Sequence, residues 1–459
     1  NERIDKHNTS VKLKTEEIPM PQLFPFTDPA DVKAGYPRAI VRCEGATVID
    51  EDGNRFYDAV SGLWCASLGF SHPRLVEAAR TQMETLSYYH SFMGRTPQVS
   101  NALAETLTEV TPRGIGHFIY GQSGSDAVDT AIKLVRYYQN ARGKPSKKKI
   151  LARDGAYHGA GGMSAALTAF SYCHDGFDTP LDTVIRLTLP HYAKEGRPGE
   201  SETAFKDRLC RELEEKIAAH GADTIGAMIG EPVLGAGGVI PPPEGYWEAV
   251  QRILKKNDIL AISDETITGF GRTGCWFGCE RYGLEPDIMT MAKQLTAAHF
   301  PLSAVGLSDT VHQEIAAFAH AHGTLGHGFT YGGHPVGAAV ALETLAIYRD
   351  MDLETHVARL AQNLATALTD VAPSPFVFEV RQAGFMAGVE LTSDTEEKDG
   401  LARKVASEAE KRGVFFRVIG NTLAISPPYI ATPDEIEWLV RTLQESLNAA
   451  TAELEPIPS

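Results

Sequence analysis

Lys293 follows a short apolar segment, residues 287–292, and precedes a turn of small residues. The nearest acidic residues along the chain are Asp287 and Asp309, so no local partner neutralises its charge. A lysine ammonium at the end of a buried strand is costly unless it is paired or has lost its proton. Two interpretations are open: a lysine whose head group reaches solvent, or one whose lowered pKa lets its amine form a Schiff base.

Asp264 is the second candidate, because it ends the apolar run of residues 259–263 and precedes the glycine-rich sequence TITGFGRTG. Carboxylates at the carboxyl ends of parallel strands often contact ligands in α/β proteins. A single aspartate at this point could equally cap a helix or a loop. If both apolar segments are parallel strands of one sheet, Asp264 and Lys293 lie at the same edge.

A turn rich in glycine and serine lies in residues 120–136, YGQSGSDAVDTAIKLVR, between a predicted strand and a predicted helix. The backbone N–H groups of such a turn, with the helix dipole behind them, can bind an anion. Gly124 would allow a close approach, and the hydroxyls of Ser123 and Ser125 could donate hydrogen bonds. The alternative is a capping turn, with Ser123 or Ser125 as the N-cap.

Three further side chains could contact a ligand. Tyr157 and His158 follow a predicted strand and are flanked by glycines. Rings exposed in this way can stack on a planar ligand, or the segment can be a surface turn with a partly buried tyrosine. Arg417 lies in the apolar segment FFRVIGNTLAI, where it could clamp a carboxylate or form an ion pair at a strand edge. The histidines within residues 312–334 have no standard metal-ligand spacing, so we predict no metal site.

Composition excludes some classes of function. The chain has 459 residues, enough for more than one domain, and a formal net charge of -16. This charge, with no basic stripe to offset it, argues against nucleic-acid and anionic-membrane partners. The six cysteines have neither disulfide-framework nor zinc-site spacing, and no segment is apolar enough to span a membrane. We expect a reduced, cytoplasmic protein.

The elements that must position these residues alternate along the chain. Apolar strands and helical segments follow one another from about residue 115, which predicts a mostly parallel sheet covered by helices on both faces. Residues 46–62 are typical of a β-hairpin, and the pattern after about residue 345 is α+β, with a final helix from Pro433. We predict three regions: residues 1–70 joining a small domain, a large domain at 71–344, and the small domain at 345–459.

These segments, in this order, resemble one family over most of the chain. The segments SGLWCASLGF, GQSGSDAVDTAIKLVR, AYHG, GEPVLGAGGVIPPP, SDETITGFGRTGCWFG, PDIMTMAKQLTAAHFPLSAV, HGFTYGGHPVGAA and FFRVIGNTLAISPP are similar to those of class III aminotransferases. Within that family the sequence is most similar to ω-amine:pyruvate transaminases. The resemblance implies the α/β fold type I of pyridoxal-phosphate-dependent transferases, with a seven-stranded, mostly parallel sheet in the large domain and a smaller α+β domain.

The resemblance also implies residue roles. Lys293 would form the Schiff base with pyridoxal 5'-phosphate and move the substrate proton, and Asp264 would pair with the pyridinium nitrogen. The other implied cofactor contacts are Gly124 and Ser125 at the phosphate, Tyr157 and Ile267 on the two ring faces, His158 next to Tyr157, Glu231 near the ring oxygen, and Thr330 from the neighbouring protomer. The implied substrate pocket consists of Trp64, Phe26, Tyr89, Phe92 and Arg417, and Arg417 would bind a keto-acid carboxylate or move away for amines without one.

The implied reaction transfers an amino group from a primary amine or ω-amino acid to a keto acid, with pyruvate as the expected acceptor, by a ping-pong mechanism. It implies a homodimer, or a dimer of dimers, with shared active sites. The chain departs from the usual family pattern at Gln122, Asp126, Val128, Thr266 and Gln294, which bears on pocket shape. A decarboxylase, aminomutase or racemase on the same fold, or a non-catalytic protein, is an alternative.

Overall fold

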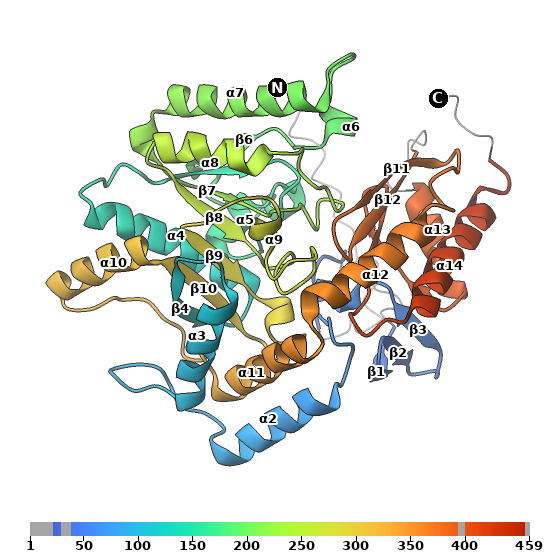
Figure 1. Cartoon of the computed structure of the whole chain (residues 1–459), viewed down its shortest axis with the longest axis horizontal. Helices are drawn as coiled ribbons and strands as arrows, with labels where there is room; N and C mark the ends of the chain where they lie inside the picture. Colours follow the sequence, from blue (N-terminus) through green and yellow to red (C-terminus); the bar gives the residue numbers. More distant parts are fainter. Residues whose placement is uncertain (1–21, 29–37, 393–399, 455–459) are drawn as a thin grey trace, which may run out of the picture.

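The computed structural model describes residues 22–28, 38–392 and 400–454. A seven-stranded sheet forms the centre of the larger part of the molecule, and helices cover both of its faces (Figure 1). The strand order is β4-β10-β9-β8-β7-β5-β6. Strand β10 is antiparallel to β4 and β9, and every other neighbouring pair is parallel. The predicted mostly parallel α/β sheet is confirmed.

The strands of this sheet are β4 (Ile115–Gly121), β5 (Lys149–Arg153), β6 (Val184–Leu187), β7 (Ile225–Gly230), β8 (Leu260–Asp264), β9 (Ile288–Met291) and β10 (Ser303–Ser308). The longer helices are α2 (Pro73–Thr85), α3 (Gln98–Val110), α4 (Gly124–Ala141), α7 (Glu202–His220), α8 (Tyr246–Lys256), α10 (Asp309–His322), α11 (Pro335–Asp350), α12 (Leu353–Leu368), α13 (Gly400–Lys411) and α14 (Pro433–Thr451). Short helices are α1 (Ser61–Trp64), α5 (Gly162–Leu167), α6 (Tyr192–Glu195) and α9 (Gly278–Arg281).

Both faces of the large sheet are buried, which explains its near-continuous apolar strands. In β7, Ala227 and Ile229 pack into the cluster that contains α4, whereas Met228 packs into the cluster that contains α7 and α8. Side chains along a strand alternate between faces, so each face of β7 needs its own apolar set. This burial fixes the carboxyl ends of β5, β7, β8 and β9 along one edge of the sheet.

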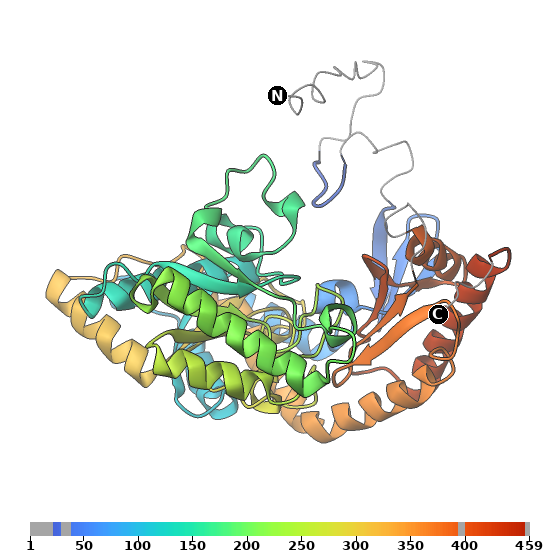
Figure 2. The same ribbon diagram turned by 90° about the horizontal axis from the view of Figure 1, so that it is seen from above.

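Two four-stranded sheets lie beside the large one, and Figure 2 shows them on one side of the molecule with α12, α13 and α14. The first consists of β1 (Ile40–Glu44), β2 (Thr47–Asp50), β3 (Arg55–Asp58) and β13 (Val414–Phe415). The second consists of β11 (Val377–Gln382), β12 (Ala387–Leu391), β15 (Thr422–Ile425) and β14 (Arg417–Ile419). Strand β13 pairs with β3, so the first sheet combines strands from the N-terminal and C-terminal parts of the sequence.

Sequence patterns identify most elements but not all. The hairpin of β2 and β3 and the final helix α14 form where they are predicted. Strand β10 is not identifiable from the sequence, because its residues SAVGLS include two serines and a glycine that dilute the apolar signal. Among the described residues, no helix combines the length and the apolar character needed to cross a membrane.

Candidate active site

Asp264 is buried at the carboxyl end of β8 and accepts three hydrogen bonds. His158 Nδ1 lies 2.7 Å from its Oδ2, while the Thr290 hydroxyl and the Thr266 backbone N–H donate to its Oδ1 at 2.8 Å and 3.2 Å. Burial by itself would raise the pKa of Asp264. The interactions with His158, together with the hydrogen bonds from Thr266 and Thr290, outweigh that effect and hold the pKa below its usual value. The site therefore contains a buried carboxylate that stays ionised.

Lys293 lies directly after β9, the neighbour of β8, in a single 3-10 turn (Lys293–Leu295). Its φ of 47° is in the left-handed region, which is strained for a lysine. Burial lowers the pKa of its ammonium; the nearby Cys65, Asp264 and Glu231 oppose this shift, and Arg417 adds to it. Within the described part of the chain its amine has no hydrogen bond or ion pair. The amine is thus held near the carboxylate without being paired with it.

Glu231 follows β7 and is buried. Its two carboxylate oxygens accept hydrogen bonds from two different loops at the carboxyl edge of the sheet. The Tyr157 backbone N–H donates to Oε1 at 3.1 Å, and the Gly235 N–H donates to Oε2 at 2.9 Å. Burial raises the pKa of Glu231, and the negative charge of Asp264 adds to the shift. Glu231 therefore connects the turn after β5 with the loop after β7.

The turn after β4 forms the N-terminus of α4. Ser123 is the N-cap and accepts from the Asp126 backbone N–H at 3.2 Å. The Ser125 hydroxyl accepts from the Ala160 backbone N–H at 3.0 Å, which fixes the Tyr157 turn against the first turn of α4. A Cβ at Gly124 would lie 2.9 Å from Thr266, so only glycine permits this approach to the loop after Asp264.

His158 departs from the sequence prediction of an exposed ring. It is 2 % exposed, and its Nδ1 contacts Asp264 instead of facing a ligand. The hydrogen bond satisfies one ring nitrogen, whereas Nε2 is buried without a partner among the described residues. Tyr157 remains partly accessible, as predicted for a ring that meets a ligand.

Three aromatic rings gather around Tyr157. Phe26 lies 6.4 Å from Tyr157 and 6.0 Å from Tyr172 in edge-on contacts, and Phe170 lies 6.4 Å from Tyr157. Phe170 and Tyr172 stack at 5.4 Å with an interplanar angle of 5°. Phe26 was predicted for the pocket, but Phe170 and Tyr172 were missed. Their signal in the sequence was the close spacing of aromatics in AFSY, shortly after Tyr157.

Trp64 and Ile267 belong to one buried cluster, which also includes Val60 and Val233. Trp64 is 2 % exposed and has a φ of 64° in a tight turn. Asp58 holds that turn, because its carboxylate accepts from the backbone N–H groups of Val60 and Gly62, both at 2.9 Å. The turn therefore presents Trp64 to the same loop that carries Ile267.

Arg417 is exposed at the start of β14, an edge strand, and does not lie inside an apolar strand as its sequence context suggested. Phe416 separates β13 from β14, so Arg417 begins a new strand and its side chain is exposed. Its positive charge lowers the pKa of Tyr157 and Tyr172, although burial raises both overall. Arg417 also acts on the pKa of Lys293, so it lies within electrostatic range of the site.

Tyr89, Phe92 and Thr330 form a separate exposed group. The Tyr88 hydroxyl donates to the Thr330 carbonyl at 2.8 Å, and a Cβ at Gly328 would lie 3.4 Å from the Phe92 ring. Among the residues that the structure describes, no hydrogen bond, ion pair or ring contact joins this group to Lys293 or Asp264.

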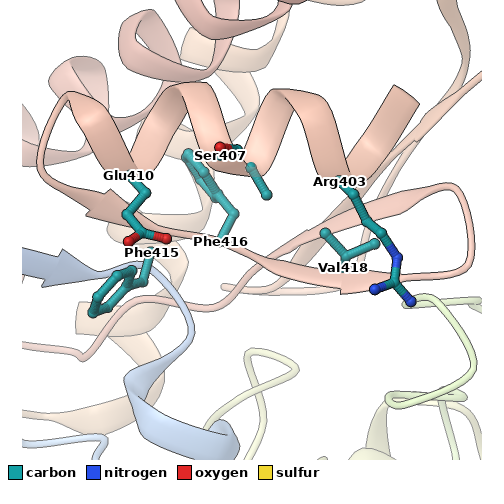
Figure 3. A pocket seen from close by; sticks show the side chains of 7 residues that line it. Arg403, Ser407, Glu410, Phe415, Phe416 and Val418 are labelled. Atoms are coloured by element: carbon teal, nitrogen blue, oxygen red, sulfur yellow. The ribbon is translucent and has the colours of Figure 1, made fainter. Parts of the chain in front are cut away.

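Two surface cavities lie away from these residues. One of about 390 Å³ lies between α13 and the β13–β14 segment, and Figure 3 shows Glu410, Ser407 and Arg403 above Phe415, Phe416 and Val418. The other, of about 570 Å³, lies between α2 and α11. None of the predicted site residues lines either cavity.

The histidines of the 312–334 stretch have separate partners. His327 contacts Thr130 and Lys133, both at 2.9 Å, and His334 accepts from the Val336 backbone N–H at 3.2 Å. His312 stacks on His117. A different cluster, His191 with Glu379 and Glu390, has ligand-type atoms close together. Arg381 donates to both of its carboxylates, at 2.6 and 2.5 Å, so a cation occupies that position already.

Comparisons with known proteins agree with this geometry. The chain matches the class III aminotransferase family over residues 30–447. It is 43 % identical to gamma-aminobutyrate transaminase 1, mitochondrial, of Oryza sativa subsp. japonica over 93 % of this chain and 84 % of that protein. It is 42 % identical to gamma aminobutyrate transaminase 3, chloroplastic, of Solanum lycopersicum over 95 % of this chain and 85 % of that protein.

Solved structures give the same result. The omega transaminase of Pseudomonas jessenii in complex with PMP superposes with a TM-score of 0.93 at 41 % identity, covering 95 % of this chain and 98 % of that one. A transaminase solved with L-ala has a TM-score of 0.89 at 44 % identity, covering 91 % of this chain and 100 % of that one. The family match, the sequence identities and the fold all indicate the same family. The chain belongs to the class III aminotransferases, which are pyridoxal-phosphate-dependent enzymes.

Proposed function

We propose that this aminotransferase moves an amino group from a primary amine or ω-amino acid to a keto acid, with pyruvate as the acceptor. The observation that carries the proposal is the position of an unpaired amine, Lys293, and an ionised carboxylate, Asp264, at the ends of adjacent strands, with Arg417 in electrostatic range. Bound pyridoxal phosphate supplies an electron sink for cleavage of the substrate carbon–hydrogen bond.

The residues of the site fit this cofactor. The Thr266 hydroxyl oxygen is buried and has no hydrogen-bond partner among the described residues, and Thr266 lies against Gly124 at the N-terminus of α4. A helix N-terminus with a free hydroxyl suits a phosphate. Gly124 and Ser125 would hold the phosphate, and Tyr157 and Ile267 would enclose the ring. Glu231 would lie near the ring oxygen.

Asp264 would keep the ring nitrogen protonated, because an adjacent carboxylate favours the cationic form. His158 would act through Asp264 by keeping that carboxylate ionised and oriented. The Lys293 amine would hold the cofactor and then carry the substrate proton, which requires a neutral amine. Burial, which lowers the pKa of Lys293, favours that form.

Substrate selection would rest on Trp64, Phe26 and Arg417. Trp64 and Phe26 offer aromatic walls to the apolar part of an amine. Arg417 would pair with the carboxylate of the keto acid, and its exposed position on an edge strand lets the side chain move aside for amines that lack a carboxylate. The gamma-aminobutyrate transaminases among the relatives make an ω-amino acid a second donor class to test.

The exposed group of Tyr89, Phe92 and Thr330 supports a homodimer. Large apolar side chains of the same segment are exposed, including Leu86, Tyr88 and Met93, and Met93 is 90 % exposed. A contiguous apolar surface of this kind is typical of an interface. In a homodimer, Thr330 would reach the phosphate of the partner's site, and Tyr89 and Phe92 would complete its substrate pocket.

An absorbance experiment tests the proposed reaction. Purified holoenzyme receives an aralkyl amine or γ-aminobutyrate, and then pyruvate. We expect the visible band of the lysine-bound cofactor to disappear with amine and to return with pyruvate as alanine forms. A band that disappears but returns only with another keto acid would contradict pyruvate as the acceptor. Release of carbon dioxide or an isomerised amine, without alanine, would favour the decarboxylase, aminomutase or racemase alternatives.

A further inference from the structure

Gln294, the residue after Lys293, is fully buried and makes a contact that the proposed reaction does not use. Its side-chain amide donates to the backbone carbonyl of Ile267 at 2.9 Å. Its Oε1 is buried without a hydrogen-bond partner in the described part of the chain. This donated hydrogen bond links the Lys293 turn to the loop that follows Asp264.

The contact joins two loops that leave the carboxyl ends of adjacent strands. Ile267 is three residues after Asp264, at the end of β8, and Gln294 is three residues after Met291, at the end of β9. At the strand ends themselves, the Glu265 backbone N–H donates to the Thr290 carbonyl at 2.9 Å. The Gln294 amide extends this pairing beyond the sheet, where backbone groups no longer connect the loops.

The backbone of Gln294 is also held from the opposite side. The Tyr348 hydroxyl donates to the Gln294 carbonyl at 2.8 Å, and Tyr348 in turn contacts the Ser67 hydroxyl at 2.6 Å. All three residues are buried. The preceding Lys293 has a strained φ of 47°. A strained turn keeps its conformation only when its surroundings fix it, and Gln294 provides contacts on two sides of this one.

We propose that Gln294 is a positioning residue that sets the placement of the Lys293 amine relative to the loop that follows Asp264. This inference rests on the proposed role of Lys293. In this role Gln294 acts through the backbone of Ile267 and the Lys293 turn. Loss of its amide donor would let the two loops separate and change the surroundings of the Lys293 nitrogen, while the fold stays intact.

A matched control exists on α4. Gln139 is also fully buried, its amide donates to the Gly226 carbonyl at 3.3 Å, and its Oε1 also has no partner among the described residues. It lies on the helix interior, away from the edge that carries Lys293. Gln294→Met and Gln139→Met therefore remove the same chemical group with similar volume. Only the first substitution removes the hydrogen bond from the Gln294 amide to the Ile267 carbonyl.

The test is a spectrophotometric pH titration of the lysine-bound cofactor in the two holoenzyme variants, together with their melting temperatures, kcat and KM. We expect Gln294→Met to shift the titration midpoint by about half a pH unit, a threefold change in the protonation ratio. We also expect it to lower kcat about tenfold, with a smaller change in KM. Gln139→Met should lower the melting temperature without moving the midpoint.

A Gln294→Met enzyme with the midpoint and kcat of the unmodified protein would overturn the proposal, whatever its melting temperature. If Gln294→Met does not fold, Gln294→Ala takes its place and is judged by the same midpoint. Failure of the unmodified protein to cycle with amine and pyruvate would refute the proposed substrates only, because the titration needs bound cofactor and no turnover.

Discussion

His158 Nδ1 lies 2.7 Å from Asp264 Oδ2, and the two buried side chains connect the turn after β5 with the end of β8. The two residues are 106 positions apart in the sequence. The contact explains how a carboxylate can remain ionised in a buried position, since burial alone would raise its pKa. It also makes His158 a residue that acts on the chemistry through Asp264.

Replacing Asp264 should remove activity and leave the fold. In Asp264→Asn, the amide oxygen can still accept from Thr290 and Thr266, so the loop keeps its local contacts. The negative charge is lost, and we expect kcat to fall by about a thousandfold, as for other electrostatic groups of an active site. Steady-state kinetics and a thermal melt would check this. Activity within tenfold of the unmodified enzyme would contradict the role of Asp264.

Replacing His158 should move the acidic limb of the pH profile. Because His158 holds the pKa of Asp264 down, His158→Gln should raise that pKa, so activity would be lost at a higher pH than in the unmodified enzyme. The same sign applies to stability: the contribution of Asp264 is present above its ordinary value of 3.8 and is lost as the pH falls through its lowered value. Profiles of kcat that extend below pH 3.8 would measure the shift, and identical acidic limbs would refute it.

The lowered pKa of Lys293 predicts the pH dependence of cofactor uptake. Its neutral amine should be available at lower pH than the ordinary value of 10.5, because burial disfavours the ammonium. We expect the rate at which apoenzyme takes up pyridoxal phosphate to reach half of its plateau below that pH. Lys293→Met should lack the band of the lysine-bound cofactor. A half-plateau at or above the ordinary value would contradict a neutral buried amine.

Replacing Arg417 should change the KM for the keto acid more than the KM for the amine. Arg417→Leu removes a guanidinium that can pair bidentately with a carboxylate, so we expect KM for pyruvate to rise about a hundredfold, in line with a lost charged hydrogen-bond pair. Kinetics with an aralkyl amine donor should change little. Arg412→Leu is the control, because Arg412 pairs with Glu408 on the surface. Equal effects on amine and keto acid would argue against a carboxylate clamp.

The dimer proposal predicts that a charge on the exposed apolar segment separates the protomers. Met93→Asp places a carboxylate where an apolar side chain would be buried by a partner. We expect light scattering to show monomers, with activity lost in parallel because Thr330 would no longer reach a partner's site. Phe378→Asp, on the edge strand β11, is the control. A monomeric and fully active Met93→Asp enzyme would refute shared active sites.

Lys293 and Asp264 each follow a short apolar run that is typical of a buried strand, so the sequence predicts both at one sheet edge if the two strands are parallel, and the family resemblance adds their roles. The sequence also determined the turn at Gly124, since a strand, a glycine and a capped helix are encoded within a few residues. Local patterns therefore predicted the two residues proposed for the chemistry and the class of fold.

Residues that are far apart in the sequence come together through the packing of the whole chain. The strand order β9-β8-β7-β5 brings His158 to Asp264 and the Gln294 amide to the Ile267 carbonyl. It also places Phe170 and Tyr172 around Tyr157. Local periodicity does not encode this order. The exposure of Arg417 likewise depends on β14 being an edge strand. Apolar patterns specify that a strand is buried, but its neighbours are chosen by the packing of the whole sheet.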